Sequence, residues 1–249
     1  VWQLPLSPLY KYTDFVDIPT MMDMAKAMIH GLVPFRDVFE QRGPYMYMIN
    51  LISCLPGNSI HWVWVLELIN FGILYGIFYK TARLTVNEKH SKWLACISVN
   101  LIPINSAFNQ GAAPEEFMLV PTIYLFYVIL KMATNNRKDP TTVENFLLGL
   151  GLSWIVFIKY SNIGAIATFF VIYGLILLKN KRFKLFGKTV LTSVSGLIVG
   201  SLPAFAYFGY NHAIGVFLKS YFIENTGATN QSLIHLLKNM IAPILVNIG

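Results

Sequence analysis

The sequence carries little charge for its length. Only 12% of its 249 residues are Asp, Glu, Lys or Arg, whereas 55% are hydrophobic and the mean hydropathy is +0.54. A soluble domain carries roughly twice that share of charged residues. Several apolar runs approach the roughly 20 residues that cross the core of a bilayer. The composition argues against a soluble domain and predicts a polytopic membrane protein of the cell membrane.

Cysteine and the common catalytic signatures are also scarce. Cys54 and Cys96 both lie in apolar segments, which excludes a disulfide framework and a paired-cysteine metal site. The sequence has no Walker-type loop, no GxGxxG and no HExxH, and no two histidines stand four residues apart. An enzyme of this composition therefore needs a donor substrate that arrives already activated. We expect no cofactor, and the sequence leaves a requirement for a divalent metal open.

The net charge is +7, and the charged residues are distributed unevenly between the two predicted sides of the membrane. Basic residues fall in three short loops on one predicted side, whereas most acids fall on the other side. Because short cytoplasmic loops are rich in lysine and arginine, the basic side is predicted to be cytoplasmic. A nucleic-acid-binding protein would need a basic face on a soluble domain, which this sequence lacks. The basic residues are Lys80, Arg83, Lys89, Lys92, Lys131, Arg137, Lys138, Lys179, Lys181, Arg182, Lys184 and Lys188.

Continuous apolar runs, rather than alternating ones, predict an all-α fold. We expect an extracytoplasmic acidic loop at residues 1–43 and a transmembrane region at 44–249 with seven or eight spans. The first run either forms a tilted half-span or continues into the second. The predicted spans are 44–56, 59–80, 92–106, 115–132, 143–159, 162–179 and 189–208, with an eighth candidate at 232–248.

A short helix is predicted from Thr20 to His30, within the acidic loop. Pro19 suits its first turn, and Gly31 suits its C-terminal stop. Apolar side chains, mostly methionines, share one face, and polar side chains share another. The helix either lies in the membrane interface or packs on its neighbours.

Carboxylates gather on the predicted outer side, where a base could act. Asp17 precedes the short helix, whose N-terminal dipole favours an ionised carboxylate. Such a group can accept a proton from an acceptor hydroxyl, or it can simply cap the helix. Asp14 is the competing candidate. Asp37 either orients the acceptor or forms an ion pair with Arg36 or Arg42.

Two basic residues on the same side are candidates for binding a phosphate. Arg42 precedes Gly43 and Pro44 at the start of a predicted helix, and such an N-terminus with an arginine beside it can bind anions. Lys159 ends a span on the side that is otherwise poor in lysine. The alternatives are that Arg42 contacts phospholipid headgroups and that Lys159 snorkels toward them.

Further acids begin or interrupt the spans. Glu115 and Glu116 follow Pro114 in a predicted first turn, where they either suit the helix dipole or contact a sugar or an arginine. Glu67 lies deep within a span, where a charge costs on the order of 2.5–3.5 kcal/mol. It must be protonated, paired or turned toward a polar cavity. The spacing of Gly196 and Gly200 predicts close helix packing.

The segment from Gly31 to Pro44 resembles the GT-C membrane glycosyltransferases, in particular the protein-mannosyltransferase-like and aminoarabinose-transferase-like group. Their pattern is Gly-x-x-Pro-Tyr-x-Asp-x-Phe-x-x-Lys-Gly-Pro, and here Phe35 stands for Tyr and Arg42 for Lys. The family aspartate upstream falls best on Asp17. Weaker likenesses extend the resemblance over roughly residues 1–226, at Gln110 to Glu116, Phe157 to Asn162 and Ile223 to Asn225.

The resemblance implies an inverting sugar transfer from a polyprenyl-phosphate donor to an acceptor hydroxyl of a cell-envelope glycan, lipid or protein. The loop aspartate would act as the base, with Asp17 and Asp37 as catalytic candidates, and the prenyl tail would lie among membrane lipids against the spans. Family members have a full span before the acidic loop, so we expect this chain to be a fragment. The candidate substrate-binding residues are Asp14, Arg36, Arg42, Glu115, Glu116, Lys159 and Asn162.

Two other functions stay open at this point. A transporter or flippase of a lipid-linked glycan would place charged residues along a path at the midplane, for which Glu67 is the one candidate. A non-catalytic fragment or assembly partner would need none of these side chains to meet.

Overall fold

The computed structural model describes residues 6–8, 17–55, 59, 61–104, 108 and 111–224. Within that part of the chain the secondary structure is helical, apart from an isolated bridge between Pro34 and Val38. The helices are α1 (Asp17–Ile29), α2 (Pro44–Asn50), η1 (Leu51–Cys54), α3 (His61–Ala82), α4 (Glu88–Leu101), η2 (Ile102–Ile104), α5 (Pro114–Thr134), α6 (Thr142–Lys159), η3 (Tyr160–Asn162), α7 (Gly164–Lys179), α8 (Phe183–Tyr210), α9 (Ile214–Leu218) and η4 (Lys219–Glu224).

Four of these helices are long and apolar enough to cross a membrane, as expected of a helical membrane protein. They are α3, α5, α6 with its continuation η3, and α8. α7 is apolar but shorter, with 16 residues. α4 has 14 residues, which corresponds to about 21 Å of helix.

The number of full-length spans is therefore smaller than predicted within the described residues. The predicted span at 44–56 forms only α2 and η1, because the regular α-helix ends after seven residues. The join between this run and the second, at residues 56–58 and 60, lies outside the described residues. The eighth candidate, 232–248, lies outside the described residues.

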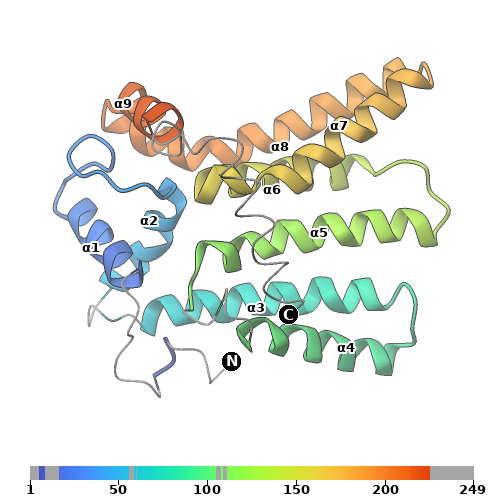
Figure 1. Ribbon diagram of the computed structural model, residues 1–249, viewed down its shortest axis with the longest axis horizontal. Coiled ribbons are helices and arrows are strands. Elements are labelled where there is room, and N and C mark those ends of the chain that lie inside the picture. Colours follow the sequence, from blue (N-terminus) through green and yellow to red (C-terminus); the bar gives the residue numbers. More distant parts are fainter. Residues whose placement is uncertain are drawn as a thin grey trace, which may run out of the picture.

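The long helices α3 to α8 form a bundle, and α1, α2 and α9 gather at one of its ends (Figure 1). The connections α3–α4, α5–α6 and α7–α8 all lie at the opposite end (Figure 1). These connections contain or adjoin all three predicted sets of basic residues. The prediction that these sets share one end agrees with the arrangement of the helices.

The closest helix pairing joins α6 and α8 through small residues. A Cβ added to Gly149 would collide with the carbonyl oxygen of Ser193, and one added to Gly196 would collide with that of Phe146. The hydroxyl oxygens of Ser153 and Ser201 lie 3.0 Å apart across the same pairing. The prediction that Gly196 and Gly200 allow close helix packing is therefore confirmed, and the helix packed against them is α6.

α1 packs on α2 and η1 rather than standing apart. Its apolar face is buried at Met21, Met24 and Ala25. The helix ends because Gly31 has a φ of +85°, and the N–H of the next residue returns to the carbonyl of Ala27 at 2.9 Å. The predicted bounds of 20–30 fall close to the observed bounds.

Candidate functional site

The loop between α1 and α2 is anchored by an aromatic side chain. Phe35 has a φ of +67°, which is unusual for a residue with a Cβ, and its side chain is buried. The centroid of its ring lies 5.6–6.0 Å from the centroids of four other aromatic rings. These rings belong to Tyr47 of α2, Phe208 of α8, Phe217 of α9 and Tyr221 of η4. Burial of this ring holds the tight turn and fixes where the charged residues beside it lie.

Arg36 and Asp37 pair with each other within this turn. Arg36 donates from Nε to Oδ1 of Asp37 at 3.0 Å and from Nη2 to Oδ2 at 2.9 Å. Asp37 Oδ2 also accepts the backbone N–H of Val33 at 2.8 Å, and Arg36 Nη1 donates to the carbonyl of Asn211 at 3.0 Å. The pair therefore ties the loop to the end of α8, which is the ion-pair alternative raised by the sequence.

The same contacts determine the chemistry open to Asp37. The hydrogen bonds from Arg36 and from the Val33 N–H lower the pKa of Asp37 below its ordinary value. A carboxylate with a lowered pKa is a weaker proton acceptor. Asp37 is thus better suited to holding the loop than to serving as a general base.

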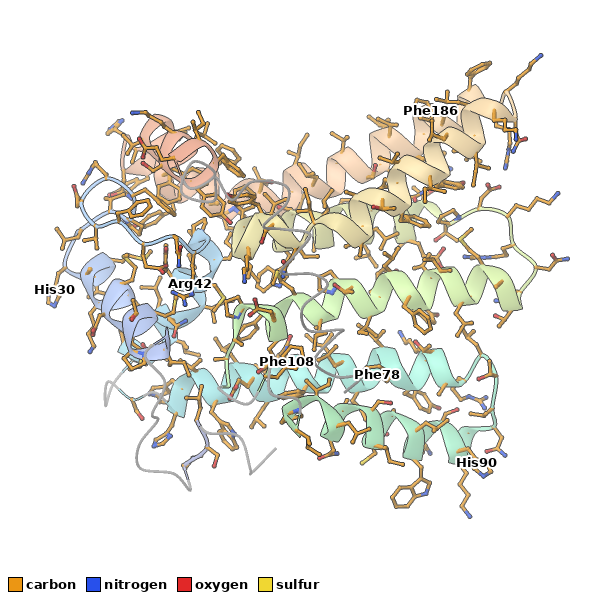
Figure 2. The ribbon with its side chains drawn as sticks, in the orientation of Figure 1. His30, Arg42, Phe78, His90, Phe108 and Phe186 are labelled. Carbon is orange, nitrogen blue, oxygen red and sulfur yellow. The ribbon has the colours of Figure 1, made fainter. Side chains whose placement is uncertain are left out.

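Arg42 contacts the carboxylate of Glu40. Its Nη1 lies 2.6 Å from Glu40 Oε1, and its backbone N–H donates to Oε2 at 2.9 Å. The Tyr47 hydroxyl oxygen lies 2.7 Å from the Arg42 carbonyl oxygen and 2.8 Å from Glu40 Oε2, and its single proton is donated to one of these two acceptors at a time. Figure 2 shows Arg42 beside α1 and α2, at the end of the molecule opposite His90. α2 is too short to form an anion site of its own, so a phosphate here would have to compete with Glu40.

Lys159 pairs with Glu115, which joins the end of α6 to the first turn of α5. The Nζ to Oε1 distance is 2.6 Å, and the two side chains are 47% and 35% exposed. Asn162 follows in η3 and is exposed, with its Oδ1 3.3 Å from the Ser161 hydroxyl. Lys159 and Asn162 are therefore reachable from outside the protein.

Arg42 and Lys159 approach each other through their neighbours. The N–H of Gly43 donates to the carbonyl of Ile158 at 2.9 Å. A Cβ at Gly43 would collide with the carbonyl oxygen of Phe157, so glycine is what permits this close contact. The two basic residues predicted to bind phosphate thus flank one backbone hydrogen bond.

Glu116 lies apart from Glu115 and pairs with Glu67. Both side chains are fully buried, and their carboxyl groups interact electrostatically. Two carboxylates buried beside each other repel, so a proton on one of them is what makes the arrangement tolerable. Glu67 also accepts the N–H of Ala112, and no other donor of the described residues reaches Glu67 Oε2 or either Glu116 oxygen. The sequence identified Glu67 as needing a partner but did not identify Glu116 as that partner.

A small hollow lies where α1, Arg42 and the start of α5 meet. Its lining includes Ile18, Met46 and residues 111–114, and its volume is about 10 Å³. This is room for about one water molecule and too little for a sugar. Asp17 begins α1 next to Ile18, but its side chain, like all of Asp14, lies outside the described residues.

A larger, apolar groove of about 360 Å³ runs between α3, α5 and α6. Its lining reaches from Asn70, Phe117 and Trp154 toward Ile77 and Leu147, which lie nearer the basic connections. The Trp154 indole donates to the Phe117 carbonyl at 2.9 Å. The end of the groove nearer the acidic loop thus begins one residue from Glu116.

No group of three or more His, Cys, Asp or Glu that could hold a metal ion occurs among the described residues. Cys54 and Cys96 are both free thiols. No protein-family model, no curated protein and no solved structure matches the chain. The likeness to the GT-C enzymes therefore rests on the motif residues in the sequence, above all on the 31–44 segment.

Proposed function

We propose that the chain is a multi-pass glycosyltransferase of the cell membrane, with a GT-C-like fold. It would transfer a sugar from a polyprenyl phosphate to an acceptor hydroxyl at the extracytoplasmic face. The observation that supports this proposal most is the backbone hydrogen bond between Gly43 and Ile158. Arg42 and Lys159 are the sequence neighbours of these two residues, so the bond brings their backbones together. Two cations at the end of an apolar bundle suit a phosphate that is attached to a lipid.

The proposed reaction is a displacement at the sugar's C1. Asp17 takes the proton of the acceptor hydroxyl as the acceptor oxygen forms its bond to C1. The bond from C1 to the phosphate oxygen breaks, and the lipid phosphate leaves with the electron pair. Arg42 and Lys159 stabilise the charge that develops on that phosphate. In this proposal the phosphate displaces Glu40 and Glu115 from the two basic residues.

The apolar groove between α3, α5 and α6 suits the prenyl tail. Its wall is formed mainly by aliphatic and aromatic side chains. It lies between three helices long enough to cross a membrane, one of which, α6, reaches Lys159. A tail in this groove would bring its phosphate toward the outer ends of α5 and α6. The small size of the hollow beside Arg42 means that the sugar site must open when the donor binds.

Asp17→Asn in the full-length protein tests the role of the base. Transfer from a polyprenyl-phosphate sugar should fall by at least about 100-fold, as is typical for removal of a general base. Asp23→Asn is the matched control, because Asp23 lies on the same helix with its side chain 73% exposed. Equal transfer by wild type and Asp17→Asn would exclude Asp17 as the base. Absence of transfer by the wild-type protein itself would favour a non-catalytic role.

A transporter is the second candidate, and the buried Glu67–Glu116 pair favours it. A carboxyl pair that holds a proton inside a helical bundle is a feature of proton-linked transport. The test is flux of a lipid-linked glycan across proteoliposomes without any acceptor present. Flux that disappears in Glu116→Gln, with no sugar transfer by either protein, would support the transporter over the enzyme.

A further inference from the structure

A second groove opens at the other end of the bundle, between α5 and α7. α7 and α8 run together and diverge from α5 toward the three hairpin connections (Figure 1). The space left between α5 and α7 measures about 620 Å³, which is within the usual range for a small-molecule site. Its position is opposite the acidic loop, so it does not belong to the proposed sugar site.

The walls of this groove are apolar and face outward. Ile129 of α5 is 45% exposed, and Ile172 and Ile176 of α7 are 54% and 48% exposed. The α7 wall reaches from Ala165 to Ile176, about 16 Å along a helix. An exposed apolar channel of this length suits one hydrocarbon chain that lies along the helices.

The mouth of the groove is polar and carries a net positive charge. Lys138, Asp139 and Arg182 line it, which gives two positive charges and one negative charge. These residues lie in the connections α5–α6 and α7–α8, where the long helices end. In a membrane this level corresponds to the lipid headgroups.

Arg182 is held in a fixed orientation at this mouth. It donates from Nη1 and Nη2 to the two carboxylate oxygens of Asp139 at 2.8 and 2.6 Å, and the Tyr173 hydroxyl donates to Asp139 Oδ1 at 2.8 Å. A guanidinium has five N–H donors, so this pair leaves donors for an anion. The hydrogen bond from Arg182 also lowers the pKa of Asp139, which keeps the pair ionised and the net charge of the mouth positive at neutral pH.

We propose that this groove binds an anionic phospholipid of the leaflet at the basic end, with one acyl chain between α5 and α7 and the phosphate at Lys138 and Arg182. The net positive charge of the mouth favours an anionic lipid over a zwitterionic one. The inference goes beyond the proposed enzyme, because it requires only that the chain lies in a membrane.

The test is native mass spectrometry of the full chain in detergent, with equal amounts of dioleoyl-phosphatidylglycerol and dioleoyl-phosphatidylcholine. The anionic lipid should be retained preferentially. Lys138→Gln should weaken its binding about fivefold, which corresponds to the loss of one lysine near an anionic headgroup. Lys184→Gln is the matched control, since Lys184 is an exposed lysine at the same end but does not line the groove, and it should change little. Equal retention of both lipids, or equal loss in both variants, would overturn the proposal.

A second variant pair tests the chain-binding part of the groove without changing charge. Thr168→Trp places a large ring in the groove and should reduce binding of the anionic lipid. Ile198→Trp, at an exposed position of α8 outside the groove, should not. Displacement of the lipid by glycerol phosphate alone would mean that the mouth binds phosphate without a chain, which contradicts the proposal.

Discussion

The ammonium of Lys159 lies 2.6 Å from the carboxylate of Glu115, so the end of α6 and the first turn of α5 meet at one ion pair. Both side chains are more than a third exposed, and an exposed pair of this kind contributes about 0.2–1 kcal/mol to stability. This pair is therefore a small part of what holds α5 to α6. Its charge is available for another partner at little cost in stability.

Lys159→Met should separate stability from function. Its thermal unfolding should change little, because less than about 1 kcal/mol is lost, whereas sugar transfer should fall at least tenfold if Lys159 contacts the phosphate. The measurements are the melting temperature in detergent and the rate of transfer. The exchange of the pair, Lys159→Glu with Glu115→Lys, is the control, because it restores the ion pair but moves the cation. Full transfer in Lys159→Met would remove Lys159 from the proposed site.

The contact between α6 and α8 predicts opposite effects for two glycines of one helix. Gly196→Ala should lower the stability by about 1–3 kcal/mol, because its Cβ would overlap the Phe146 carbonyl oxygen and force the helices apart. Gly187→Ala is the matched control, since nothing lies within 4 Å of its added Cβ. It should raise the stability by up to about 1 kcal/mol, as alanine favours helix. Equal effects on the melting temperature would contradict this packing.

The local parts of the fold could be predicted from the sequence because local rules decide them. Gly31 ends α1, while Pro44 and Pro114 begin α2 and α5, as their residue types indicate. The basic loops also share one end as predicted. The sequence left two alternatives for the run after Pro44, because its apolar composition does not say where the regular helix ends, and the run packs as a short element against α1.

The pairing of the charged residues was predictable only in part. The sequence offered Arg36 or Arg42 as the partner of Asp37, and the turn at Phe35 selects Arg36. The partners of Lys159 and Glu67 depend on which helices are adjacent, since they lie 44 and 49 residues away along the chain. Only packing in three dimensions decides such long-range partners.

The Arg36–Asp37 pair predicts a specific dependence of stability on pH. Because the folded pKa of Asp37 lies below its ordinary value of 3.8, the stabilisation is complete above about pH 4 and is lost as the pH falls through the lowered pKa. Asp37→Asn should therefore melt at a lower temperature than wild type at pH 6, and the difference should shrink as the pH falls below 4. Asp23→Asn should track the wild type throughout. A constant difference between Asp37→Asn and wild type would contradict the pair's role.

The burial of Glu67 beside Glu116 predicts that the site is more stable when one of the two carboxyls is neutral. Glu116→Gln should therefore cost little, because its amide has the same shape and is always neutral. Glu116→Leu should also cost little, because it removes two buried oxygens that have no hydrogen-bond partner among the described residues.

Removal of both carboxyls provides the decisive comparison. The cost of the double variant Glu67→Leu with Glu116→Leu should differ from the sum of the two single leucine variants, because either single variant already removes the electrostatic interaction between the carboxyls. The free energies of unfolding of all four proteins close a double-mutant cycle, and an interaction energy near zero would mean that the two carboxyls do not depend on each other. A clear interaction energy would make the pair one unit, which either secures the loop at Ala112 above the proposed sugar site or holds the proton of a transporter.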